Sequence, residues 1–81
     1  MQMNKTVLIT GVAGLLGSRL ADWIIENKPE YKVVGIDDLS GGFKENINPK
    51  VNFWQMDLVN HPIENCFEQH KPDYVFHFAA Y

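Results

Sequence analysis

Three glycines, Gly11, Gly14 and Gly17, recur at a regular spacing directly after the apolar run at 7–9. A glycine turn between a strand and a helix lets backbone N–H groups and the positive helix end meet a phosphate. In the related Gly-x-Gly-x-x-Gly pattern, the first glycine permits the turn, the second permits close approach of a pyrophosphate, and the third lets helix and strand pack closely. Because the first gap here is one residue longer, these roles are assigned by analogy. The alternative is a purely structural turn that holds no ligand.

An acidic residue, Asp37, ends the next apolar segment and lies 20 residues after Gly17. The dinucleotide-binding pattern has an acid at about this distance, where it accepts hydrogen bonds from the adenosine ribose. A turn or helix cap is the alternative role, open to Asp37 or to its neighbour Asp38, although we do not expect both to be caps. Asp37 would repel a 2′-phosphate, and no arginine lies in the segment 38–50, where Lys44 is the residue we consider for neutralising one. The sequence therefore favours NAD over NADP.

Four ordered motifs resemble the extended short-chain dehydrogenase/reductase family, and within it the NAD-dependent nucleotide-sugar epimerases and dehydratases. They are the Thr-Gly-x-x-Gly-x-x-Gly turn at 10–17, Gly-Ile-Asp-Asp-Leu-Ser-Gly-Gly at 35–42, Met-Asp-Leu at 56–58 and Val-Phe-His-Phe-Ala-Ala at 75–80. The resemblance spans essentially the whole chain, and four motifs in order are more specific than any one of them. It implies a Rossmann domain with NAD as its cofactor.

The resemblance also implies which residues would contact NAD. They are Gly11, Ala13, Gly14, Leu15, Leu16 and Gly17 in the turn, Asp37, Asp38 and Leu39 after the second strand, Asp57 and Leu58 near the adenine, and Phe78, Ala79 and Ala80 after the fourth strand. Asp57 is expected at a strand end, where a carboxylate can accept from the adenine amino group; the alternative is a solvated loop acid. The small residues at 79–80 would leave room for a flat ligand. Ordinary packing is the alternative there, above all for Phe78.

Apolar runs and helical spacing predict alternating strands and helices. Strands are expected at 5–10, 32–37, 51–55 and 74–78, and helices at 15–27 and 62–69, with a polar segment over 38–50. Such alternation predicts an α/β fold: a Rossmann-type, doubly wound parallel sheet, partial in this chain, with right-handed crossovers and strand order 3-2-1-4.

The helix at 15–27 carries large apolar residues at helical spacing. They are Leu16, Leu20, Trp23 and Ile24. We expect Trp23 and Ile24 to face the core.

Composition limits the class of protein. The chain has 81 residues, of which 46% are hydrophobic, so we expect one globular unit with no room for a second domain. A net charge of −3 without a basic run makes nucleic acid and anionic membranes poor partners. No apolar stretch approaches the roughly 20 residues needed to span a bilayer. The lone Cys66 forms no internal disulfide, and the N-terminal residues lack a signal-peptide pattern, so we expect a cytoplasmic location.

The remaining reactive residues give weaker signals. His61 and His70 are expected at the surface, and His77 as a hydrogen-bonded residue of the core. None of the three has metal-ligand spacing with Cys66, so no metal site is predicted. Arg19 is expected to be a solvated helix residue, close enough to the turn to touch a phosphate.

The family's catalytic pair, Tyr-x-x-x-Lys, is absent from this chain. Four residues after Tyr31 and Tyr74 stand a glycine and a phenylalanine, and Tyr81 is the last residue. No catalytic residue is therefore assigned. We interpret residues 1–81 as the N-terminal part of an NAD-binding Rossmann domain whose catalytic and substrate-binding parts lie elsewhere.

The resemblance implies that the parent enzyme binds a nucleotide sugar through those other parts. It would oxidise a sugar hydroxyl carbon by transient hydride transfer, as an epimerase or a dehydratase, and a homo-oligomer is compatible with this reading. The alternatives are a non-catalytic dinucleotide-binding module and another NAD(P)-dependent reductase of the same family. A Tyr-x-x-x-Lys pair further along the parent protein would favour the enzyme.

Overall fold

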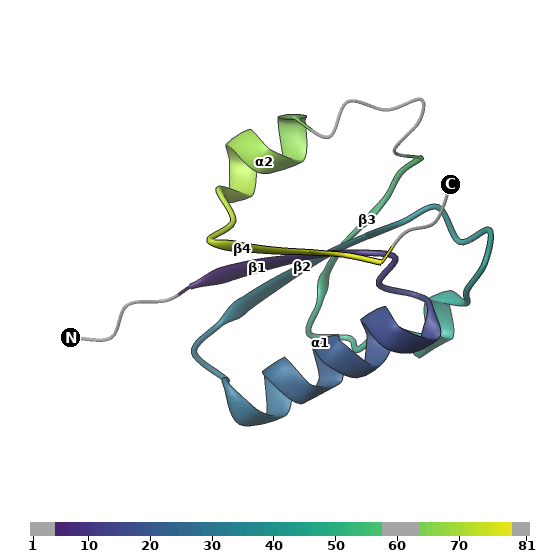
Figure 1. Cartoon of the computed structure of the whole chain (residues 1–81), viewed down its shortest axis with the longest axis horizontal. Helices are drawn as coiled ribbons and strands as arrows, with labels where there is room; N and C mark the ends of the chain where they lie inside the picture. Colours follow the sequence, from purple (N-terminus) through teal and green to yellow (C-terminus); the bar gives the residue numbers. More distant parts are fainter. Residues whose placement is uncertain (1–4, 58–63, 79–81) are drawn as a thin grey trace.

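The computed structural model of the chain describes residues 5–57 and 64–78. Four strands form one parallel sheet in the order β3-β2-β1-β4. They are β1 (Thr6–Thr10), β2 (Lys32–Asp37), β3 (Asn52–Gln55) and β4 (Tyr74–His77). Two helices, α1 (Leu15–Asn27) and α2 (Glu64–His70), lie on opposite faces of the sheet (Figure 1). The strand order and the two-sided cover confirm the predicted doubly wound α/β fold.

The observed elements differ from the predicted ones only at their ends and in the polar segment. The bounds of α1 and β2 are those expected, whereas β1 and β3 begin one residue later and β4 ends one residue earlier. Helix α2 ends at His70, one residue beyond the prediction, and its predicted start at 62–63 lies outside the described residues. A short 3-10 helix, η1 (Lys44–Asn46), lies within the polar segment 38–50, for which no element was predicted.

Two apolar layers hold the sheet. The layer between the sheet and α1 consists of Val7, Ile9, Val12, Ala21, Ile24, Val33 and Val51. The layer on the α2 side consists of Leu8, Val34 and Ile36, with Trp54 and Met56 packed against it. Because β1 and β2 lie in the middle of the sheet and carry apolar residues without alternation, both of their faces are buried, as parallel strands require.

The helix α1 meets the sheet through small residues, which corrects one expectation. Its buried residues are Gly17, Ser18, Ala21 and Ile24, whereas Leu16 and Trp23 are 64% and 55% exposed. A Cβ on Gly17 would lie 2.9 Å from the carbonyl carbon of Gly11, so the helix start approaches the turn more closely than a side chain would allow. The buried stripe therefore follows the small residues, and Leu16 and Trp23 lie outside it.

Strand β4 forms one edge of the sheet, beside β1, and all four of its residues are exposed. The exposed fractions of Tyr74, Val75 and Phe76 are 46%, 48% and 41%. Within residues 5–57 and 64–78, no helix has the length and apolar character needed to cross a membrane.

Candidate functional site

The glycine turn joins β1 to α1 at the carboxyl end of a central strand. Gly11 has a φ of 74°, in the left-handed region that favours glycine, and its N–H donates to the carbonyl of Ile36 (2.8 Å). The Gly14 N–H donates to the Gly11 carbonyl (3.1 Å), and the Ser18 N–H makes the first helical bond, to the Gly14 carbonyl (2.9 Å). The turn is thus closed by main-chain hydrogen bonds on both sides of Gly14.

Three main-chain N–H groups at the start of α1 take no part in these hydrogen bonds. Within the described part of the chain, those of Leu15, Leu16 and Gly17 donate to no acceptor. The first N–H groups of a helix lack intrahelical partners and lie at its positive end, where they favour an anion. A Cβ on Gly14 would meet only the Gly11 carbonyl oxygen, at the ordinary contact distance of 3.4 Å, so little protein surrounds this position. The geometry fits a phosphate group.

Asp37 connects the end of β2 to this turn. Its Oδ2 accepts from the Ala13 N–H (2.9 Å), and its Oδ1 accepts from the Leu39 N–H (2.8 Å). Leu39 has a φ of 67°, a conformation that a bulky side chain rarely adopts. Since an ionised carboxylate offers about four lone-pair positions, Asp37 keeps the capacity to accept from ligand hydroxyl groups.

The hydrogen bonds of the neighbouring residue, Asp38, differ from a second expectation of the sequence analysis. Asp38 Oδ1 accepts from both the N–H (2.9 Å) and the Oγ (2.7 Å) of Ser40, and these bonds lower the pKa of Asp38. Asp37 and Asp38 therefore both cap turns, although the sequence analysis expected at most one of them to do so. The reason is local: each side chain reaches the N–H two residues ahead, as aspartate does in turns.

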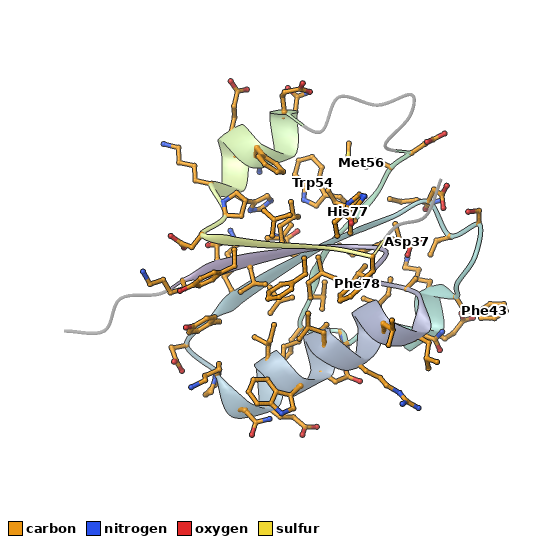
Figure 2. All side chains as sticks on the ribbon, viewed as in Figure 1. Asp37, Phe43, Trp54, Met56, His77 and Phe78 are labelled. Carbon is orange, nitrogen blue, oxygen red and sulfur yellow. The ribbon has the colours of Figure 1, made fainter. Side chains whose placement is uncertain are left out.

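Two further predicted contacts lie at the carboxyl ends of strands. Asp57 is half-buried and follows Met56, whose N–H donates to the Asp37 carbonyl (3.1 Å), so the ends of β2 and β3 are adjacent. Phe78 donates its N–H to the Thr10 carbonyl (3.0 Å), and its side chain lies on the α1 side of the sheet (Figure 2). The other predicted contacts here, Leu58, Ala79 and Ala80, lie outside the described residues.

His77 is hydrogen-bonded as expected, through its Nδ1 to the Thr10 Oγ1 at 2.7 Å. It is exposed, however, and does not belong to the core, because β4 is at the edge of the sheet. Figure 2 shows it on the same side of the sheet as Trp54 and Met56. Arg19 is exposed, as expected, and no group of His, Cys, Asp or Glu among the described residues could hold a metal ion.

His70 corrects a third expectation, since it is buried rather than at the surface. Its Nε2 accepts from the Trp54 indole N–H (3.1 Å), the two rings meet edge to face, and Lys32 Nζ lies 2.9 Å from its Nδ1. Burial, and then the charge of Lys32, lower the pKa of His70. The sequence did hold a signal, because His70 follows the apolar Phe67 by three residues, about one helical turn.

Two residues outside the predicted contact set also contact the turn, and one of them, Gly42, is the last residue of the motif at 35–42. Asn46 Nδ2 donates to the Ala13 carbonyl (3.2 Å), and Gly42 packs against the same peptide. No local pattern identifies Asn46, because its contact joins residues 33 positions apart.

Comparison with known proteins assigns this arrangement to a family. The sequence matches the model of the NAD dependent epimerase/dehydratase family over residues 7–81. It is 37% identical over 78 residues to the UDP-glucose 4-epimerase of Mycolicibacterium smegmatis, a match that covers 90% of this chain and 24% of that protein.

Solved structures agree in fold. The UDP-glucose 4-epimerase of Thermotoga maritima, determined with UDP-glucose, has a TM-score of 0.85 and 41% identity, over 93% of this chain and 24% of that one. The UDP-glucose 4-epimerase of Thermus thermophilus, in complex with NAD, has a TM-score of 0.83 and 32% identity, over 94% and 24%. The chain thus spans about a quarter of the length of these relatives.

Proposed function

The chain belongs to the NAD-dependent epimerase/dehydratase family, and we propose that residues 1–81 are the N-terminal part of its NAD-binding Rossmann domain. The catalytic and sugar-binding parts would then belong to the remainder of a longer protein. Two facts support this: the chain spans about a quarter of its relatives, and it contains no Tyr-x-x-x-Lys pair.

The observation that carries the proposal is the set of acceptor-free N–H groups at the start of α1. The N–H groups of Leu15, Leu16 and Gly17 would hold the pyrophosphate of NAD, beside Gly14. Asp37, already oriented by Ala13 and Leu39, would accept from the adenosine ribose through its remaining lone pairs.

The other predicted contacts surround this centre. Asp57 would accept from the adenine amino group. Asp38, Leu39 and Leu58 would border the adenosine, and Phe78, Ala79 and Ala80 would line the groove toward the nicotinamide.

In the longer protein we expect a nucleotide sugar as substrate. When bound, NAD supplies a transient acceptor for the hydride of a sugar hydroxyl carbon, and the remainder of the protein decides between epimerisation and elimination. A non-catalytic dinucleotide-binding module is the second candidate, because the site at the turn and at Asp37 is suited to holding a dinucleotide and includes no catalytic group. A Tyr-x-x-x-Lys pair further along the full-length protein would separate the two. A cytoplasmic location and a homo-oligomeric state stay predictions.

Titration of the full-length protein with NAD tests the site. We expect Gly14→Val to abolish NAD binding while the fold is largely kept, because its side chain would project into the space of the pyrophosphate and its Cβ would contact the protein only at the Gly11 carbonyl oxygen, at 3.4 Å. Gly41→Ala is the matched control, since a Cβ there has nothing within 4 Å and NAD affinity should be unchanged. Normal NAD binding by Gly14→Val would refute the assignment of the phosphate site.

Cofactor choice is tested by a side-by-side titration with NAD and NADP. The carboxylate of Asp37 would repel a 2′-phosphate, and the segment 38–50 offers no arginine to neutralise it. We therefore expect tighter binding of NAD. Tighter binding of NADP would remove Asp37 from the ribose site.

A further inference from the structure

The segment 42–46 follows β2 in the sequence and packs directly against the glycine turn that follows β1. The side-chain amide of Asn46, in η1, donates to the carbonyl of Ala13 at 3.2 Å. A Cβ on Gly42 would lie 2.6 Å from the carbonyl carbon of Ala13 and 3.0 Å from the nitrogen of Gly14. Only a glycine permits this approach, so Gly42 allows the segment to reach the turn and Asn46 fastens it there.

Both main-chain polar groups of Ala13 are therefore hydrogen-bonded to side chains. Its N–H donates to Asp37 and its carbonyl accepts from Asn46. Ala13 itself is fully buried. In an α-helix, the carbonyl of residue 13 is the acceptor for the N–H of residue 17. Here that carbonyl is engaged by Asn46, and among the described residues the Gly17 N–H donates to no acceptor.

We propose that Asn46, admitted by Gly42, is a positioning residue for the pyrophosphate site. By holding the Ala13 carbonyl toward η1, it keeps this carbonyl from turning to the Gly17 N–H, which stays available for a phosphate oxygen. Asn46 acts through Ala13 and does not touch the cofactor. The inference rests on the proposed function, since it concerns the same NAD site.

A second asparagine, Asn48, follows this segment by two residues and provides the matched comparison. Asn48 Nδ2 donates to Asp22 Oδ1 at 3.1 Å and so fastens the segment to the middle of α1, away from the turn. Removing either amide loosens the segment, but only the loss of Asn46 releases the Ala13 carbonyl. The two positions therefore separate an effect on the phosphate site from an effect on general stability.

The experiment uses the full-length protein, as wild type and as the variants Asn46→Ala, Asn48→Ala and Gly42→Ala. For each, the affinities for NAD, ADP-ribose and adenosine are measured by titration, and the melting temperature is measured without ligand. Adenosine lacks the pyrophosphate and serves as the internal reference.

We expect Asn46→Ala to weaken binding of NAD and ADP-ribose by about tenfold while adenosine affinity is unchanged, as the loss of one ordered phosphate contact implies. Gly42→Ala should have the same selective effect, because its side chain would push the segment away from Ala13. Asn48→Ala should lower the melting temperature without changing the ratio of ADP-ribose to adenosine affinity.

The outcomes distinguish the inference from its premise. If the wild type does not bind NAD, the proposed function fails. If the wild type binds NAD and neither Asn46→Ala nor Gly42→Ala changes the ratio of ADP-ribose to adenosine affinity, the inference is overturned and the function stands. Equal losses for all three ligands, in step with the melting temperature, would show that Asn46 is merely structural and would also overturn it.

Discussion

Strands β1 and β4 are neighbours in the same sheet and have similarly apolar sequences, yet their environments differ. In β1 every residue after the first is buried, whereas all four residues of β4 are exposed. β1 lies between β2 and β4 and is covered by an apolar layer on each face, while β4 has one strand neighbour. Burial is thus set by the position in the sheet as much as by residue type.

The two helices also differ in how they contact the sheet. Helix α1 has 13 residues, and its buried residues are the small Gly17, Ser18 and Ala21 together with Ile24. Helix α2 has 7 residues, and His70, on its last turn, meets β2 and β3 through Lys32 and Trp54. Apolar packing stabilises the unit formed by β1, α1 and β2. The contact of α2 with the sheet also includes polar interactions of His70 with Lys32 and Trp54.

The largest effect is expected when residues 1–81 are made alone. An exposed edge strand and a large apolar patch favour association, and a chain of this size buries only about 60% of its unfolded surface. We expect this polypeptide to self-associate or stay partly unfolded, and sedimentation with thermal melting measures both.

The variant Phe76→Lys sharpens this prediction. It places a charge on the exposed β4 and should reduce association. A stable, cooperative monomer of residues 1–81 would instead show that the apolar surface of β4 needs no partner.

Two adjacent residues of α1 allow the loss of a buried side chain, Ile24, to be compared with the loss of an exposed one, Trp23. Ile24→Ala should lower the free energy of unfolding by about 2–5 kcal/mol, because the side chain is in the buried layer. Trp23→Ala removes a larger side chain that is 55% exposed, so its cost should be clearly smaller. Denaturant unfolding of both variants in the full-length protein measures the difference. An equal or larger loss for Trp23→Ala would place the packing face of α1 elsewhere.

The smallest effect concerns the pH dependence of the contact between α2 and the sheet. Burial and Lys32 lower the pKa of His70 in the folded state, so the unfolded chain binds the proton more readily. Stability should therefore be fully present above the ordinary histidine pKa of about 6.5 and be lost as the pH falls through the lowered value.

Melting curves across this range measure the effect. The melting temperature of the wild type should fall more steeply with decreasing pH than that of His70→Gln. His77→Gln, at an exposed histidine, should keep the steep dependence. Identical pH profiles of the wild type and His70→Gln would exclude a contribution of His70.

The sequence predicted the order and approximate bounds of strands and helices, because glycine spacing and apolar periodicity are local properties. It also placed Asp37 at the tip of a strand. It misplaced Trp23, because helical spacing identifies candidates for a buried face without saying which of them the sheet covers. It misplaced His70 and His77, because their exposure depends on the contact with Trp54 and on the edge position of β4.

The sequence by itself determined the parallel α/β architecture and the strand–turn–helix unit at 6–27, since these follow from neighbouring residues and the general rules of chain connection. Only the tertiary structure decided that Asp37 and Asn46 hold the two sides of Ala13, and that His70 lies against Trp54 and Lys32. These contacts join segments 16 to 38 residues apart, and their partners are defined only when the strands stand side by side in the sheet.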